Sequence, residues 1–405
     1  MRILFYNHTG QVSGAEYLLL MILARLDRAT FQPVVLCPGQ GPLQQRVKEL
    51  DLPVVTVASL DARFTFRADQ LFRYLKSFVH VVRDVRRKVI EANPDLIHAN
   101  SIRAGLVATA ATFNLKTRVV WHLHDLLPRH PLSTLIRTYA VLSSRARMIA
   151  VSRAVADNFC GGFFALQSRV KVILNAIELN RFQPDAGAGR KTRDQLPLGG
   201  GDPLIGIVGQ LTPRKGQLEL VRAFARVVRE MPNAMLLIVG APLFNRDQEY
   251  AELIQQTIQE LKIGDSVHLT GARTDVSAVM QALDLLVVNS TAEPFGLVAL
   301  EAMACNTPVI AAVSGGIPEI IDHNWTGWLI PQGDEAALAE AMLYLARRPE
   351  VRSRLIVESQ NHVASYFSAD RYLADLEAFY CSPRDQRTTV SEDSGVGQTE
   401  AARFA

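Results

Sequence analysis

The chain has 405 residues, 48% hydrophobic and 20% charged, which is too long for one ordinary core and predicts two globular domains of roughly 100–200 residues. The net charge of +3 hides an asymmetry, because residues 1–180 carry 23 Lys and Arg against 12 Asp and Glu and the remainder carries 20 against 28. The sequence contains no run of ~18 apolar residues, so no membrane span is predicted. The four cysteines are far apart in the sequence, which argues against disulfides or zinc and favours a cytoplasmic location.

Short apolar runs alternate with helical patterns along the chain, and Met1 leads directly into the first run, so no signal peptide is expected. The predicted strands are 3–7, 33–37, 53–57, 96–99, 119–124, 148–152, 170–174, 204–209, 235–240, 267–271, 285–289 and 309–312. Helical patterns such as 15–26 and 217–229 lie between them. Repeated alternation of this kind predicts an α/β fold with parallel sheets covered by helices on both faces.

The first strand is followed by a glycine-containing loop, Gly10-Gln-Val-Ser-Gly-Ala-Glu16. Its glycines allow a close backbone approach to a ligand, and the helix after it can direct N–H groups at an anion. The loop is neither the Gly-x-Gly-x-x-Gly dinucleotide motif nor a Walker A loop. By itself it indicates a phosphate site only weakly.

Residues 63–90 combine eight Lys and Arg residues with apolar residues at roughly helical spacing. A basic amphipathic helix of this kind binds anionic membrane surfaces. The alternative is a packed crossover helix with a solvated basic face, and the sequence does not decide between them. Nucleic acid is not expected as a partner, because neither zinc-finger spacing nor an RNA-binding aromatic motif occurs.

A glycine-rich stretch, 183–202, separates the two halves and is predicted to be a surface insertion or linker. The chain is polar and without periodicity from residue 383 onward, which predicts a disordered tail. Two doubly wound domains facing each other across a cleft are therefore expected, a favoured arrangement for small-molecule sites.

The first strand of the second half runs directly into Val208-Gly-Gln-Leu-Thr-Pro-Arg-Lys-Gly216. This order places Arg214 and Lys215 at the carboxyl edge of the sheet. Two cations there can neutralise a diphosphate, Arg through a bidentate fork and Lys as a point charge. The alternative is a pair of exposed loop cations with no ligand.

The most informative segment is Glu-Pro-Phe-Gly-Leu-Val-Ala-Leu-Glu, from Glu293 to Glu301. Glu293 follows a buried apolar run and so lies at the carboxyl end of a strand, where ligands of open α/β sheets bind. The turn after it directs helix N–H groups toward the same edge, and Glu301 lies about a turn and a half into that helix. Carboxylates beside free N–H groups suit a ligand with sugar hydroxyls and phosphate.

A helix cap at Glu293 and a solvated charge at Glu301 are the alternative explanation. The segment 307–321 counts against it, because it repeats the order of strand, glycine loop and helix start. Gly315 and Gly316 allow close backbone approach, and Pro318 and Glu319 fit the first positions of a helix. Two such turns in succession suggest a ligand site.

Taken together, Gly-Ala-Glu after the first strand, Arg-Lys-Gly, Glu-x7-Glu and Gly-Gly-Ile-Pro-Glu resemble the retaining glycosyltransferases of family 4. The similarity extends to about Cys381 and includes Trp121-His-Leu-His-Asp125. It implies the GT-B fold of two Rossmann-like domains. The implied divisions are an acceptor domain at 1–180, a nucleotide-sugar-binding domain at 181–365, a C-terminal helix returning to the first domain at 366–382, and the tail at 383–405.

The resemblance also implies a role for each matched residue. Lys215 and Arg214 would bind the diphosphate, Glu293 the hydroxyls of the transferred sugar, and Glu301 the ribose hydroxyls. Gly14 would let the first domain close on the diphosphate, and His124 would lie near the reacting centre. The implied catalytic set is Lys215, Arg214, Glu293 and His124, and the implied donor-binding set is Gly14, Gly209, Arg214, Lys215, Glu293, Phe295, Gly296, Leu297 and Glu301.

Two positions depart from the family pattern. Gln210 stands where members commonly carry a basic residue, and Ser13 stands where many have glycine. More of the diphosphate charge would therefore fall on Arg214 and Lys215.

The expected activity is retaining, metal-independent transfer of a hexosyl-type sugar from a nucleotide-diphosphate sugar to an acceptor hydroxyl, with no cofactor. The sequence lacks the Asp-x-Asp metal motif of the other major glycosyltransferase fold. The expected acceptor is a glycan or a lipid-linked molecule in surface glycan or glycolipid synthesis, met at the inner membrane face. Alternatives are a nucleotide-sugar epimerase, a sugar phosphorylase, a non-catalytic nucleotide-sugar-binding partner in a glycan assembly complex, and a membrane-surface scaffold.

Overall fold

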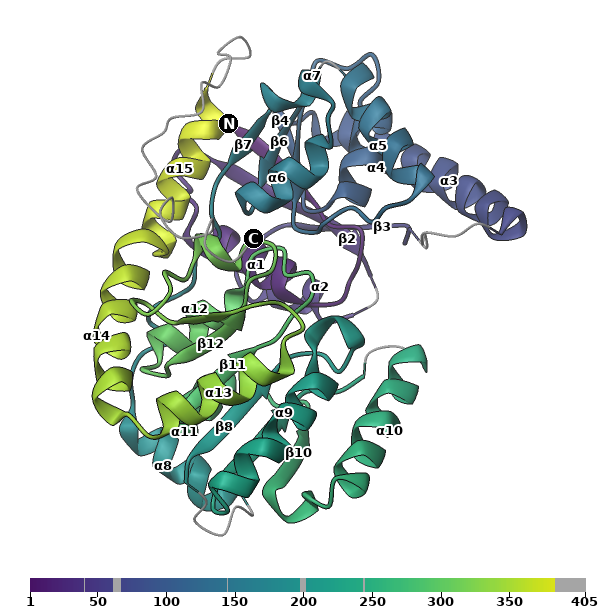
Figure 1. Cartoon of the computed structure of the whole chain (residues 1–405). Helices are drawn as coiled ribbons and strands as arrows, with labels where there is room; N and C mark the ends of the chain where they lie inside the picture. Colours follow the sequence, from purple (N-terminus) through teal and green to yellow (C-terminus); the bar gives the residue numbers. More distant parts are fainter. Residues whose placement is uncertain (40, 61–66, 144, 197–201, 243–244, 383–405) are drawn as a thin grey trace. The chain divides into compact units, whose positions relative to one another are not determined.

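The computed structural model describes residues 1–39, 41–60, 67–143, 145–196, 202–242 and 245–382 (Figure 1). These residues form two compact units, unit 1 with residues 1–175 and 370–382 and unit 2 with residues 176–369. Each unit contains one parallel sheet with helices, which confirms the predicted α/β class. The predicted disordered tail, 383–405, lies outside the described residues.

The sheet of unit 1 has the strand order β3-β2-β1-β4-β5-β6-β7, with every neighbouring pair parallel. Its strands are β1 (Arg2–Tyr6), β2 (Gln32–Pro38), β3 (Val54–Val57), β4 (Leu96–Ala99), β5 (Arg118–Leu123), β6 (Ala146–Ala150) and β7 (Val170–Val172). The central strands are almost wholly buried. Helices cover both faces of such a sheet, so its strands are continuous apolar runs in the sequence, and all seven predicted strands are present.

The helices of unit 1 are α1 (Gly14–Arg25), α2 (Leu43–Lys48), α3 (Ala68–Ala92), α4 (Ile102–Ala111), α5 (Pro131–Leu142), α6 (Arg153–Cys160), α7 (Phe164–Gln167) and, from Asp370 onward, α15 (Ala369–Cys381). Helix α15 is far from the others in sequence but packs on this sheet. The hydroxyl of Tyr380 lies 2.7 Å from Nδ1 of His98, and the guanidinium of Arg147 lies 4.2 Å from the centre of the Phe379 ring.

The sheet of unit 2 has the order β10-β9-β8-β11-β12-β13, again with all neighbours parallel. Its strands are β8 (Leu204–Val208), β9 (Met235–Val239), β10 (Val267–Gly271), β11 (Leu285–Val288), β12 (Val309–Ala312) and β13 (Trp328–Ile330). Five of the six were predicted. Strand β13 was not, because its three residues are too short a run to be recognised from periodicity.

The helices of unit 2 are α8 (Ala186–Gln195), α9 (Gln217–Glu230), α10 (Asn245–Glu260), α11 (Val276–Ala282), α12 (Leu297–Ala304), α13 (Glu335–Ala346) and α14 (Pro349–Tyr366), with 3-10 turns η1 (Pro213–Lys215), η2 (Gly264–Ser266) and η3 (Ile317–Glu319). Helix α9 packs with α10 and α13, whereas α11 packs with α8 and α12. The helices form two groups because the chain adds β9 and β10 on one side of β8 and then β11 to β13 on the other. Right-handed crossovers in opposite directions place their helices on opposite faces of the sheet.

Helix α8 corrects the predicted linker at 183–202. The Asp185 side chain accepts hydrogen bonds from the N–H groups of Gly187 and Ala188, at 2.9 and 3.1 Å, and so caps the helix. A Cβ on Gly189 would lie 2.4 Å from the carbonyl oxygen of Gln281 in α11. Glycine in this stretch therefore serves close helix packing in addition to loop formation, a difference that composition does not reveal.

Among the helices that the structure describes, none is long and apolar enough to cross a membrane. The four cysteines are free thiols, three of them buried and Cys381 exposed.

Candidate functional site

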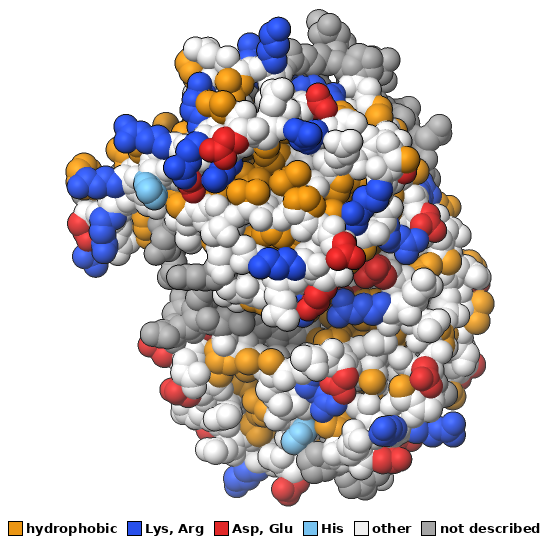
Figure 2. All heavy atoms as spheres, turned by 180° about the vertical axis from the view of Figure 1, so that it is seen from behind, with side chains coloured by type: hydrophobic (Ala, Val, Ile, Leu, Met, Phe, Trp, Pro, Cys, Tyr) orange, Lys and Arg blue, Asp and Glu red, His pale blue; other side chains and the backbone are white. Residues whose placement is uncertain are grey.

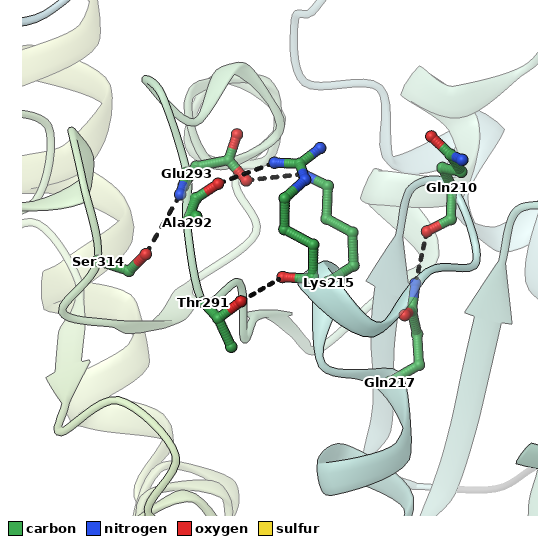
Figure 3. Close-up of polar contacts among 8 residues, drawn as sticks. Gln210, Lys215, Gln217, Thr291, Ala292, Glu293 and Ser314 are labelled. Atoms are coloured by element: carbon green, nitrogen blue, oxygen red, sulfur yellow. Dashed lines mark hydrogen bonds and ion pairs between the residues drawn. The ribbon is translucent and has the colours of Figure 1, made fainter. Parts of the chain in front are cut away.

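The two most informative segments of the sequence lie at neighbouring strand ends in unit 2. The strand order reverses between β8 and β11, and ligands of open α/β sheets bind outside the carboxyl ends of the strands at such a point. The loop after β8 carries Arg214 and Lys215, and the loop after β11 carries Glu293. Figure 3 shows Lys215 and Glu293 pointing toward each other.

Lys215 and Glu293 form an ion pair across this point. Nζ of Lys215 donates to Oε2 of Glu293 at 2.7 Å (Figure 3). The two side chains are 16% and 10% exposed. Burial disfavours the ionised form of Glu293, but the charge and hydrogen bond of Lys215, aided by Ser290 and Arg214, outweigh it and hold the pKa of Glu293 below its ordinary value. The site therefore holds a cation and a carboxylate in direct contact.

Hydrogen bonds to backbone carbonyls hold the two loops together. The N–H of Thr291 donates to the carbonyl of Arg214 at 2.9 Å, and Nδ2 of Asn289 donates to the carbonyl of Gly216 at 3.1 Å. Gly216 has φ +71°, and a Cβ there would lie 2.2 Å from the carbonyl oxygen of Asn289. Glycine is therefore needed both for the turn and for the approach of the two loops.

A third loop, after β12, holds Glu293 from the other side. The N–H of Gly316 donates to the carbonyl of Glu293 at 2.9 Å, and Oγ of Ser314 accepts from the N–H of Glu293 at 3.2 Å. Gly315 has φ +53°, and a Cβ there would lie 1.9 Å from the carbonyl oxygen of Glu293. The Gly315-Gly316 pair thus contacts the Glu293 loop directly.

The helix predicted to begin at Pro318 and Glu319 is only the single 3-10 turn η3. The chain turns again immediately afterwards, where the N–H of Asp322 donates to Oγ1 of Thr326 at 2.9 Å. This side-chain bond competes with helical continuation.

Arg214 is exposed, and its Nη1 donates to the carbonyl of Ala292 at 2.9 Å. Gly209 has φ +150°, and a Cβ there would lie 3.7 Å from Cε of Lys215. Nε2 of Gln210 donates to Oδ2 of Asp247 at 2.7 Å. The cations of the 209–216 loop are therefore Arg214 and Lys215, both close to the Glu293 segment.

The predicted backbone segment 295–297 leads into α12. The Phe295 side chain is buried, with its ring centre 6.1 Å from that of Phe367, so the side chain belongs to the core. Gly296 has φ +112° and precedes Leu297, the first residue of α12. What this segment can present to a ligand is its backbone.

Glu301 lies on α12 and is partly buried. Burial raises its pKa to about 7, against the opposing charges of Arg181 and Lys215. Glu301 is therefore not the fully solvated surface charge of the alternative explanation. Arg181 was not singled out from the sequence, because nothing in its local pattern connects it with a helix more than a hundred residues away.

Gly14 and His124 lie in unit 1. Gly14 is the exposed first residue of α1. His124 directly follows β5, and its Nε2 lies 3.1 Å from Oδ1 of Asn100, which directly follows β4. Burial lowers the pKa of His124 to about 3, so its imidazole is neutral near pH 7.

Sequence reasoning assigned no role to Asn7, Glu16 and Asn100, the polar residues around His124, although Glu16 belongs to the Gly-Ala-Glu motif. A usable signal existed for the two asparagines, since each directly follows a buried strand. In the part of the chain that the structure describes, no group of three or more His, Cys, Asp or Glu residues is arranged to hold a metal ion.

Two family models match the chain, Glycosyltransferase Family 4 over residues 12–181 and Glycosyl transferases group 1 over residues 189–362. Similar curated proteins include D-inositol 3-phosphate glycosyltransferases. That of Actinosynnema mirum is 33% identical over 253 residues, 60% of this chain and 59% of the relative. That of Salinispora arenicola is 29% identical over 395 residues, 92% of this chain and 88% of the relative. In three such relatives the match spans 66%, 59% and 56% of the relative's length.

Among solved structures, Anabaena HepE in complex with UDP-glucose has a TM-score of 0.81 at 28% identity, covering 94% of this chain and 99% of HepE. Sucrose-phosphate synthase from Thermosynechococcus elongatus has a TM-score of 0.75 at 22% identity, covering 94% and 98%. The predicted GT-B fold is confirmed by these structural matches.

Proposed function

Because the chain belongs to the family 4 glycosyltransferases, the glycosyl transferases group 1, we propose that it moves a sugar from a nucleotide-diphosphate sugar to an acceptor hydroxyl with retention of configuration. The observation that carries this proposal is the contact of Lys215 with Glu293 where the strand order of unit 2 reverses, between β8 and β11. A UDP-hexose is the first candidate donor, since HepE binds UDP-glucose in a similar structure.

In this proposal Lys215 and Arg214 bind the diphosphate, and Glu293 accepts hydrogen bonds from the transferred sugar. Glu301 accepts from the ribose hydroxyls. His124 is the proposed substrate contact of unit 1. The neutralised pair of Lys215 and Glu293 supports these roles, because a diphosphate can take over the cation while sugar hydroxyls donate to the carboxylate.

The proposed reaction forms a bond from the acceptor oxygen to the anomeric carbon and breaks the bond from that carbon to the phosphate oxygen. The acceptor hydroxyl attacks on the face that the diphosphate leaves, and the leaving phosphate oxygen takes its proton. The side chains position the reactants and stabilise the charge of the departing diphosphate. The proposal requires neither a metal nor a cofactor.

Removal of the Lys215 charge tests the proposed function. Lys215→Ala should lower kcat about 10²–10³-fold, the usual effect of losing one transition-state donor. Lys215→Arg should retain more activity, and Arg347→Ala, which removes an exposed cation paired with Glu230, should change little. Thermal unfolding of each variant distinguishes lost chemistry from lost folding. Near-normal turnover of a folded Lys215→Ala protein would refute the assignment.

The acceptor side of the proposal is a glycan or lipid-linked acceptor at the cytoplasmic face of a membrane, in surface glycan or glycolipid synthesis. Helix α3 supports it. The C-terminal half of α3 is packed through the buried Val81, Val85 and Val89, whereas Phe72 and Leu75 are each 59% exposed. Figure 2 shows basic and apolar side chains together on this projecting helix. An exposed apolar and basic helix end suits an anionic lipid surface.

Vesicle binding tests the membrane part. The chain should bind vesicles containing phosphatidylglycerol more than phosphatidylcholine vesicles, and less at high salt. Phe72→Ser combined with Leu75→Ser should abolish binding. Val357→Ser, at an exposed apolar residue of unit 2, is the matched control. Equal binding by the double variant would exclude α3 as the contact.

A further inference from the structure

A line of polar side chains crosses the carboxyl edge of the unit 1 sheet, from Glu16 through Asn7 and Asn100 to His124. Asn7, Asn100 and His124 directly follow β1, β4 and β5, which are adjacent strands. Glu16, Asn7 and Asn100 are only 3%, 0% and 1% exposed. Buried polar groups at this depth depend on protein partners for their hydrogen bonds, so their orientations can be worked out from those partners.

The amide of Asn7 has one possible orientation. Its Nδ2 lies 2.7 Å from the carbonyl oxygen of Thr9 and 3.2 Å from Oε1 of Glu16. A backbone carbonyl can only accept, and the carboxylate accepts, so the NH₂ group must face them. Oδ1 of Asn7 is thereby directed to Asn100.

The amide of Asn100 is oriented in the same way. Its Nδ2 lies 3.0 Å from Oδ1 of Asn7 and 3.3 Å from the carbonyl oxygen of Ala15, both acceptors. Its Oδ1 therefore faces Nε2 of His124 at 3.1 Å. An amide oxygen has no proton to donate, so the proton of this hydrogen bond must be on Nε2.

Glu16 anchors the start of the line. Its Oε2 accepts from the backbone N–H of Ser13 at 3.0 Å and lies 2.6 Å from the Ser13 hydroxyl. These bonds hold the carboxylate at the N-terminus of α1, where negative charge is favoured. Reversing both asparagine amides would point the oxygen of Asn7 at the Thr9 carbonyl and at this carboxylate.

The other ring nitrogen of His124 has a different role. A neutral imidazole carries one N–H, so a proton on Nε2 leaves Nδ1 as an acceptor. Among the described residues, none makes a hydrogen bond to Nδ1. His124 itself is partly exposed.

We propose that Glu16, Asn7 and Asn100 are positioning residues that hold His124 as the Nε2–H tautomer and so leave Nδ1 to accept a hydrogen bond from a substrate hydroxyl. The substrate in this statement rests on the proposed function, whereas the tautomer does not. A sugar donor or acceptor substrate without the hydroxyl that binds Nδ1 would lose this hydrogen bond.

Nitrogen NMR of the full chain labelled with ¹⁵N-histidine tests the tautomer directly, because protonated and bare ring nitrogens have well-separated shifts. His124→Gln identifies the signals of His124 by their loss. The wild-type spectrum should show Nε2 protonated and Nδ1 bare. A proton on Nδ1 would overturn the proposal without any measurement of activity.

Variants of Asn100 test its control of the ring. Asn100→Ala removes the acceptor, so both tautomers should appear and kcat/KM should fall about tenfold, the effect of one ordinary hydrogen bond. Thr109→Val removes a comparable bond, from Nε1 of Trp121 at 2.8 Å, and should leave the His124 signals unchanged.

The outcomes separate this inference from the proposed function. If Asn100→Ala keeps the Nε2–H tautomer of His124, or if Thr109→Val also loses it, the line of polar side chains does not control the tautomer. The expected spectra in a protein that transfers no sugar would uphold the positioning role and refute the glycosyltransferase assignment.

Discussion

Glu301 shows how a single partly buried residue makes stability depend on pH. Its pKa rises from 4.5 to about 7 on folding, with burial as the largest cause. Between these values the folded chain retains a proton that the unfolded chain has released, so stability falls as pH rises. The stabilising contribution is complete below pH 4.5 and is lost as pH rises toward 7.

Glu301→Gln should remove this pH dependence, because the amide does not titrate. The free energy of unfolding of the variant minus that of the wild type should become progressively more positive between pH 4.5 and 7, because only the wild type loses stability over this range. Urea unfolding at a series of pH values measures the difference. Glu230→Gln, which replaces an exposed glutamate, is the control. A difference that stays constant with pH in Glu301→Gln would contradict the assigned environment.

The ion pair of Lys215 and Glu293 also acts at the residue scale. Breaking a buried pair leaves one charge without its partner, which is costly. Loss of activity in a variant of either residue must therefore be compared with its stability.

At the scale of elements, three loops converge on one carboxylate. The loops after β8, β11 and β12 approach one another through backbone contacts at Gly216 and Gly315, where a side chain has no room. The position of Glu293 therefore depends on glycines that carry no functional group.

Gly315→Ala should displace the Glu293 loop, because the new Cβ would lie 1.9 Å from the Glu293 carbonyl oxygen. Gly333→Ala is a matched control, since its φ is also positive, at +77°, but nothing lies within 4 Å. Both variants should lose about 1–2 kcal/mol of stability to backbone strain. Gly315→Ala should lose more than Gly333→Ala in urea unfolding, because only its Cβ meets a backbone atom. Only Gly315→Ala should also lose most of its sugar-transfer activity. Equal activity in the two variants would contradict the packing role.

At the scale of the whole molecule, the excess of basic residues is in the first half of the chain and the excess of acidic residues in the second. The proposed diphosphate site is nevertheless in unit 2, at Arg214 and Lys215. The proposal therefore rests on the local placement of two cations and not on the net charge of the half of the chain that carries them.

UDP should raise the unfolding temperature of the chain more than UMP does, because the proposed function assigns the diphosphate to Lys215 and Arg214. A ligand that binds only the folded state at a hundred times its Kd adds about 2.7 kcal/mol. Differential scanning fluorimetry with UDP, GDP and ADP also compares the bases. The advantage of the diphosphate should vanish in Lys215→Ala. If it persists there, the phosphate site lies elsewhere.

The sequence alone determined the α/β class, the predicted strands and the positions of Lys215 and Glu293 at strand ends. These features are local, since buried parallel strands are continuous apolar runs and the residue after a strand lies at the carboxyl edge. The short strand β13 and the helix α8 were missed because their local patterns are weak or resemble a loop.

Only the tertiary structure decided that Lys215 and Glu293, 78 positions apart, touch. It also decided that Arg181 acts on Glu301 and that Asn7 and Asn100 orient His124. These contacts depend on the order of strands in a sheet, which arises from long-range packing of apolar faces and leaves no periodic trace in the residues it brings together.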